Sequence, residues 1–71
     1  MKLLQEYQYD NITGKLYEYK LGYGYKVFTK LKNKTTCAAQ SYCYYFDKAE
    51  CLNKMNKDIE NIEYLKSNNM I

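Results

Sequence analysis

Acidic side chains are the first residues in this sequence that could perform catalysis, and their spacing argues against it. Asp58, Glu60 and Glu63 lie close together beside Lys57, in a segment whose apolar residues repeat with a helical period. General acid–base chemistry needs two carboxyl groups that converge in a cleft, whereas a solvated helical face explains these acids fully. The sequence also contains no His, the side chain that most readily exchanges protons near neutral pH. We therefore expect a protein that is not an enzyme.

The three cysteines offer little chemistry either. Cys37, Cys43 and Cys51 are an odd number of thiols, and no cleavable signal is visible at Met1–Tyr9, so a complete disulfide framework is not expected. Their spacing fits no standard zinc pattern. We expect free thiols in a reducing cytosol, without metal or cofactor, and one incidental disulfide as the main alternative. Cys51 has a weak claim to reactivity, because a position in the first turns of a helix lowers a thiol pKa.

Lysines interleaved with aromatic residues are a stronger signal, and they point to binding. Lysine ammonium groups neutralise phosphates, and exposed rings stack on bases. The alternative is that the lysines only keep a sheet from pairing edge to edge with other chains. The sequence contains no Arg, the residue that most often reads guanine, so we expect contact with a nucleic-acid backbone rather than base-specific recognition. The candidate binding residues are Lys20, Lys26, Phe28, Lys30, Lys32, Tyr42 and Tyr44.

The ten tyrosines are a second feature of the composition that bears on binding. Only about three or four rings can pack beneath one helix, and the others must lie at the surface, where tyrosine favours protein interfaces. Codon bias is the alternative, because 11 Lys, 10 Tyr, 7 Asn and 4 Ile, all with A/T-rich codons, make up 32 of the 71 residues. That bias indicates an A/T-rich genome, such as that of a low-GC bacterium, its phages or its plasmids.

The last third of the sequence predicts one helix, over residues 47–67. Asp47 is a good N-cap, Glu50 follows three residues later as in a capping box, and Phe46 can pack on Cys51 across the cap. Two consecutive asparagines then allow the helix to end in a left-handed conformation. Apolar residues recur every three or four positions and form one stripe: Leu52, Met55, Ile59, Ile62 and Leu65.

The residues before the helix alternate with a period of two, which predicts strands with one wet face. Residues 15–21 and 25–32 are the clearest strands, and residues 36–46 form a third that can contain a bulge. Gly22-Tyr23-Gly24 and Lys32-Asn33-Lys34 supply the turns between them. The glycine pair is not read as a phosphate-binding loop, because the third glycine and the following helix are missing.

These elements predict an α+β fold in one small domain, β(β)ββα, in which residues 15–46 form an antiparallel meander and the helix covers it. Residues 1–14 add an edge strand and a turn, with a short helix as the alternative. Residues 1–46 hold seven Lys and three acids and residues 47–71 hold four Lys and five acids, so their net charges are +4 and −1. The predicted core packs Leu52, Met55, Ile59 and Ile62 against Tyr17, Tyr19, Val27 and Leu31.

A three-stranded antiparallel sheet followed by a helix, here over residues 15–66, resembles the layout of small integrase amino-terminal domains, which place the sheet in the major groove. The small size and expected mobile-element origin are also similar to phage-encoded inhibitors of host defence, including anti-CRISPR proteins. The leading prediction is a non-catalytic cytosolic protein that occludes a host macromolecule such as a defence nuclease or nucleoprotein complex, with no membrane partner. An autonomous DNA-binding module that uses the basic-aromatic sheet face is the alternative, and a homodimer is left open.

Overall fold

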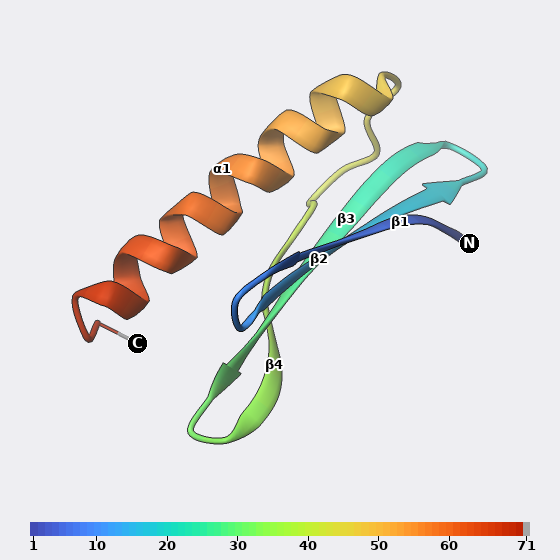
Figure 1. Ribbon diagram of the computed structural model, residues 1–71. Coiled ribbons are helices and arrows are strands. Elements are labelled where there is room, and N and C mark those ends of the chain that lie inside the picture. Colours follow the sequence, from blue (N-terminus) through green and yellow to red (C-terminus); the bar gives the residue numbers. More distant parts are fainter. Residues whose placement is uncertain (71) are drawn as a thin grey trace.

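The computed structural model describes residues 1–70 and consists of a four-stranded antiparallel sheet followed by one helix that packs on it (Figure 1). The sheet order is β1-β2-β3-β4, the same as the order in the sequence, so the strands form a meander. This confirms the predicted α+β class, and it shows that the amino-terminal segment is a strand rather than a short helix. The elements are β1 (Lys2–Tyr9), β2 (Ile12–Tyr19), β3 (Gly22–Leu31), β4 (Lys34–Gln40) and α1 (Lys48–Ser67).

Left-handed residues form two of the three tight turns. Asp10 has φ 51° in the β1–β2 turn. Lys32 and Asn33 have φ 52° and 68° in the β3–β4 turn, and two consecutive left-handed residues suit a two-residue hairpin of type I′. The predicted turn at Lys32 is therefore confirmed. The predicted turn at Gly22-Tyr23-Gly24 is displaced, because the chain reverses at Lys20 and Leu21 and Gly22 already begins β3.

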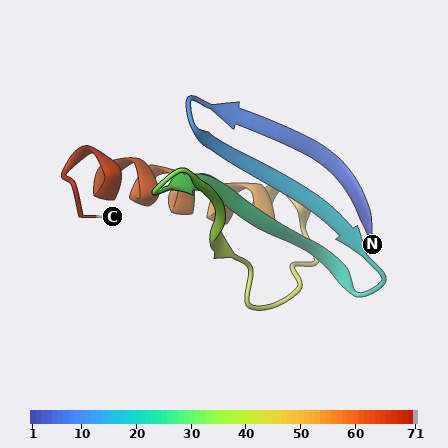
Figure 2. The same cartoon turned by 90° about the horizontal axis from the view of Figure 1, so that it is seen from below.

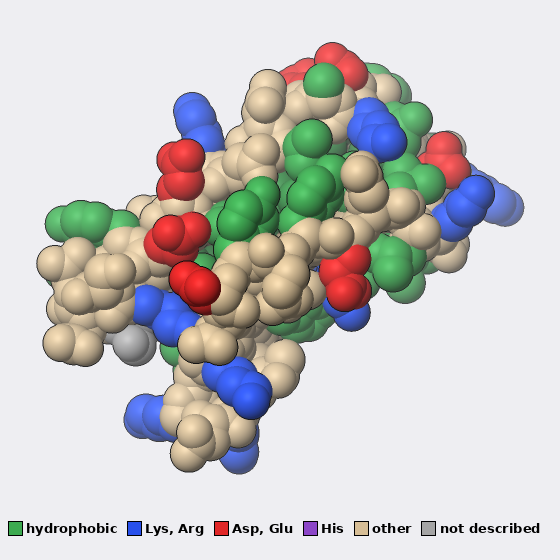
Figure 3. All heavy atoms as spheres, in the orientation of Figure 1, with side chains coloured by type: hydrophobic (Ala, Val, Ile, Leu, Met, Phe, Trp, Pro, Cys, Tyr) green, Lys and Arg blue, Asp and Glu red, His purple; other side chains and the backbone are tan. Residues whose placement is uncertain are grey.

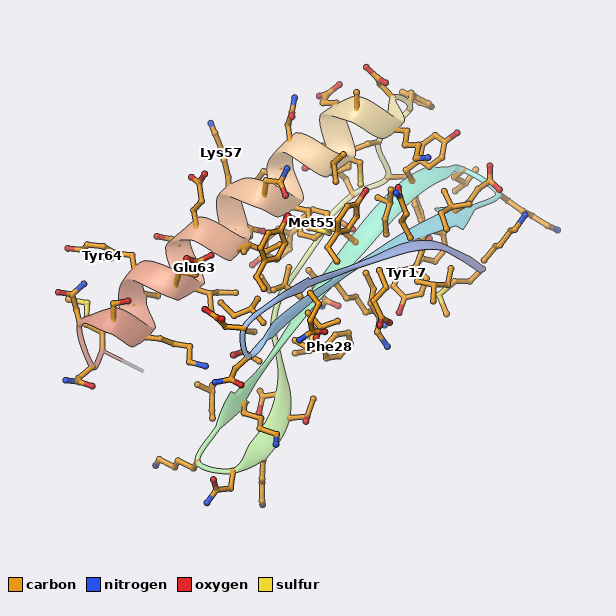
Figure 4. All side chains as sticks on the ribbon, viewed as in Figure 1. Tyr17, Phe28, Met55, Lys57, Glu63 and Tyr64 are labelled. Carbon is orange, nitrogen blue, oxygen red and sulfur yellow. The ribbon has the colours of Figure 1, made fainter. Side chains whose placement is uncertain are left out.

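The core lies between α1 and one face of the sheet. The helix runs over β3 and β2 and touches β4, and Figure 4 shows Met55 pointing into this layer. Gly14 lets the helix come close to β2, since a Cβ there would lie 3.1 Å from both Ile59 Cδ1 and Met55 Sδ. Besides Gly14 and Gly24, the buried residues are Ile12, Leu16, Tyr25, Val27, Thr29, Cys51, Met55, Ile59 and Ile62.

The predicted core on β3 is right at Val27, whereas Leu31 is only half-buried, and the predicted core on β2 is wrong. Val27 is buried as predicted, but Tyr17 and Tyr19 are half-buried on the opposite face, and their even-numbered neighbours Ile12, Gly14 and Leu16 contact the helix instead. The side chains of β2 form two alternating sets, which we call its phases, and each set contains apolar residues. Alternation alone therefore could not show which set is buried. The helix packs on the phase that contains Gly14, because two tyrosine rings would hold it away from the sheet.

The N-cap and the left-handed end of the helix follow the sequence signals, whereas the predicted packing of Phe46 does not. The Asp47 side chain accepts a hydrogen bond from the Ala49 amide at 3.1 Å, so it is the N-cap, and Asn69 has φ 54° after the last turn. Phe46 does not pack on Cys51 as predicted, because it is 93% exposed. Within the described part of the chain, no helix has both the length and the apolar character needed to cross a membrane.

The third predicted strand is shorter than expected. β4 ends at Gln40 and contains the expected bulge, since Ala38 has no partner between Cys37 and Ala39 in the register with β3. Residues 41–46 form a loop that returns to β3 once, where Tyr23 and Tyr45 exchange backbone hydrogen bonds of 2.7 and 2.9 Å. The loop can approach β3 this closely because Gly22 has no side chain. A Cβ at Gly22 would lie 2.5 Å from the Tyr45 carbonyl oxygen.

Candidate functional site

The sheet face that turns away from α1, which we call the open face, carries three of the seven predicted binding residues, Lys26, Phe28 and Lys30. Side chains alternate along a strand, so the odd-numbered residues of β2 and the even-numbered residues of β3 point away from the core. Figure 4 shows Tyr17 and Phe28 on this side, and Figure 2 views the molecule from below, with the sheet in front of the helix. The open face of the two central strands consists of Thr13, Lys15, Tyr17, Tyr19, Lys26, Phe28 and Lys30.

A pair of lysines lies at the centre of the open face. Lys15 and Lys26 are directly opposite each other in the β2–β3 register, an arrangement in which like charges repel. The Lys15 ammonium lies 3.7 Å from Glu6 and 5.3 Å from the centre of the Phe28 ring. The Lys26 ammonium lies 6.0 Å from the centre of the Tyr17 ring and makes no ion pair with any acid among residues 1–70. A bound anion would relieve this repulsion.

Aromatic rings continue the open face toward the β2–β3 turn. The ring centres of Tyr17 and Tyr19 are 6.2 Å apart, and those of Tyr19 and Tyr44 are 5.1 Å apart. The Tyr19 ring lies over Gly24, where a Cβ would come within 3.0 Å of it. We call Tyr17, Tyr19 and Tyr44 the aromatic row. The aromatic row borders the lysine pair on one side, and Phe28 borders the lysine pair on the other side.

The predicted binding residues are only partly brought together. Lys26, Phe28 and Lys30 share the open face, although Phe28 is half-buried beneath Lys15 rather than freely exposed. Lys20 and Lys32 lie in the turns at the two ends of β3.

The two predicted tyrosines behave differently from each other. Tyr44 joins the aromatic row, whereas Tyr42 is 99% exposed in the loop after β4. Prediction missed Lys15, Tyr17 and Tyr19 as open-face residues because the phase of β2 was wrong. Extending the strand back to Ile12 shows the small and aliphatic series Ile12-x-Gly14-x-Leu16, which would have identified the buried phase.

The excess of positive charge lies in the sheet part of the molecule, since residues 1–46 have a net charge of +4 and residues 47–71 of −1. Figure 3 shows acidic side chains along the helix side and lysines at the tip of the β3–β4 hairpin, where Lys30, Lys32 and Lys34 are close in the register. A hollow of about 320 Å³ lies beside Phe28 and is lined by Glu6, Thr13, Lys15, Phe28 and Thr35. Because it is open to solvent, it suits contact with a large ligand better than enclosure of a small one.

The acids of α1 lie in different surroundings. The Tyr25 hydroxyl donates a hydrogen bond to the Asp58 carboxylate, which also accepts one from Lys54 at 3.2 Å. Burial, and then the hydrogen bond to Asp58, raise the pKa of Tyr25. Glu60 and Glu63 are exposed, so Asp58 joins the helix to the sheet while its neighbours face solvent.

The three cysteines are free thiols that differ in burial. Cys51 is fully buried, and burial, helped by nearby Cys43, raises the pKa of its thiol to about 11, so the suggested reactivity of Cys51 is wrong. In residues 1–70, no three His, Cys, Asp or Glu side chains gather as a metal site would require.

Comparisons with protein-family models, curated proteins and solved structures found no match.

Proposed function

We propose that this chain is a non-catalytic binding protein of the kind that phages and mobile elements encode, and that it occludes a nucleoprotein complex in the cytosol of its host, as anti-CRISPR proteins do. The observation that supports this most is the lysine pair, Lys15 and Lys26, framed by aromatic rings on a sheet face that the helix leaves uncovered. Such a face attracts phosphates and offers rings for contact with protein or bases.

The sign of the charge favours a nucleoprotein over an empty nuclease. A nuclease groove that holds nucleic acid is itself basic, since it must neutralise phosphates, and it would repel the open face. A complex that already holds its nucleic acid presents phosphates at its surface. The lysines would contact that backbone, while the aromatic row contacts the protein beside it.

The size of the charge argues for a partner that includes protein. The open face of β2 and β3 carries three lysines, and each neutralised phosphate contributes about −0.9 to the slope of log K against log salt. A slope near −3 is far below that of proteins making about six to ten phosphate contacts. Bare DNA would therefore be held weakly, and the remaining affinity would come from apolar contacts.

An autonomous DNA-binding module is the second candidate, and a titration separates the two. Fluorescence anisotropy with single-stranded and duplex DNA at two salt concentrations measures direct binding. The same measurement with a purified nuclease complex, loaded with nucleic acid or empty, measures the proposed binding. The proposal expects the loaded complex to be bound at least tenfold more tightly than either bare DNA or the empty complex.

Charge-reversal variants identify the surface. Lys15→Glu combined with Lys26→Glu should abolish binding to the loaded complex, because the lysine pair becomes an acidic pair. Lys57→Glu is the matched control, since Lys57 is exposed on α1 and points away from the sheet (Figure 4). Equal affinity for bare DNA and the loaded complex would favour the DNA-binding module. Binding that survives the double reversal contradicts both candidates.

A further inference from the structure

The outer edge of β4 lacks the protection that the opposite edge of the sheet has. β1 and β4 are the two outer strands, and each has backbone groups on its outer side that no other strand in residues 1–70 pairs. Proteins usually block such edges with charged side chains. β1 carries Lys2 and Glu6 at exposed positions, whereas β4 has a single charge, on its first residue Lys34, and residues 35–46 contain none. Every residue of β4 except Ala39 is exposed.

The middle of β4 carries short side chains around its bulge. Ala38 is the extra residue of this bulge and has no register partner on β3. The side chains around it are short, because Thr35, Thr36, Cys37 and Ala39 have no more than three heavy atoms each. A second strand can therefore approach this edge closely, over a strand about 24 Å long.

We propose that β4 pairs antiparallel with β4 of a second copy of this chain, around a two-fold axis at Cys37. In this register Cys37 of one copy faces Cys37 of the other. Lys34 of each copy lies beside Gln40 of the other, so the like charges are at opposite ends of the paired strands. The edge is thus complementary to itself in charge and in side-chain size.

The alternative pairings of this edge fit less well. Pairing of β4 with β1 of another copy leaves one β1 and one β4 edge free, and such head-to-tail contacts grow into filaments. It would also place the charges of Lys2 and Glu6 along the interface. The two-fold pairing closes after two copies. It makes one eight-stranded sheet with both open faces on the same side, whatever ligand the open face binds.

Sedimentation equilibrium of the intact chain tests the dimer directly. Between about 10 µM and 1 mM, a range suited to a small interface, the mass should rise from 8.5 kDa toward twice that value. Cys37→Lys should hold the mass at that of one chain, because it places two ammonium groups opposite each other on the axis. Cys37→Ser and, on the β1 edge, Gln5→Lys are the matched controls and should leave the dimer intact.

Cross-linking tests the register. Directly opposed residues of antiparallel strands have Cα atoms about 4.5–5.5 Å apart, a distance that a disulfide can bridge. Mild oxidation of the Cys43→Ser variant with diamide should therefore link two copies through Cys37. A chain that stays monomeric at 1 mM, or a dimer that Cys37→Lys leaves unchanged, overturns the proposal. Because Cys37 is exposed, circular dichroism of Cys37→Lys should show an unchanged fold.

Discussion

The two faces of the sheet are built from the same strands and are both rich in large side chains, yet only one is buried. The buried face presents Leu16, Tyr25 and Val27 around Gly14, and the open face presents Tyr17 and its aromatic and lysine neighbours. Apolar content does not separate them, since the open face contains three aromatic residues on β2 and β3. Two other properties distinguish the buried face from the open face. The buried face has a glycine where the helix crosses and no lysine, so α1 approaches closely without burying a charge.

Truncation of neighbouring residues on the two faces tests most strongly whether only one face is buried. Leu16→Ala should lower the free energy of unfolding by about 2–5 kcal/mol, because it leaves a cavity under the helix, and Leu16 is fully buried. Tyr17→Ala should cost about 1 kcal/mol, because the ring is half-buried and packs on one side only. Urea denaturation followed by circular dichroism measures both.

Equal costs for the two truncations would contradict the assigned faces. A domain of this size has only a small reserve of stability, so Leu16→Ala is expected to be partly unfolded at 37 °C. Leu16→Met, which conserves volume, is the control that should remain folded.

The comparison of faces also explains what the sequence could predict. The helix was predictable because its apolar stripe has a single phase: Met55, Ile59 and Ile62 are all buried as expected. The meander was predictable because successive strands are joined by connections too short for anything but hairpins. The phase of β2 was not predictable, because Leu16 and Tyr17 are both apolar. Which of the two is buried depends on the contact between Gly14 and the helix.

The loop after β4 could not be predicted for a different reason. Residues 41–46 are aromatic and read as a strand, but their partner is the first part of β3, which begins at Gly22. The chain must also turn back over the core so that Asp47 can start the helix. Tyr42 and Phe46 are therefore left exposed. Only the three-dimensional path of the chain shows this, and it is why Tyr44, but not Tyr42, reaches the aromatic row.

A smaller effect is expected from removing one hydroxyl on each face. Tyr25→Phe should lower the free energy of unfolding by about 1–2 kcal/mol, because Asp58 loses a donor at the helix–sheet junction and hydrogen bonds to charged groups are worth more than neutral ones. Tyr19→Phe removes a hydroxyl from the open face, where water replaces it, and should be neutral within about 0.5 kcal/mol. Denaturant titrations of both variants at pH 7 give the difference. Equal losses would mean that the Tyr25–Asp58 contact adds nothing to the packing.

Alkylation of the thiols distinguishes the buried layer from the surface without any substitution in the chain. Cys37 and Cys43 are exposed and Cys51 is buried, so iodoacetamide at pH 8 should label two thiols quickly and the third only after urea is added, as counted by mass spectrometry. The pKa of Cys51 is raised in the folded state from 9.0 to about 11. The folded state therefore favours the neutral thiol, and its stability, fully present below about pH 9, should fall as the pH rises toward 11. Tyr25, whose pKa is also raised, adds to this loss above about pH 10. Three thiols labelled at one rate at pH 8 would show that the layer beneath the helix is open to solvent, and the distinction between the two faces would then fail.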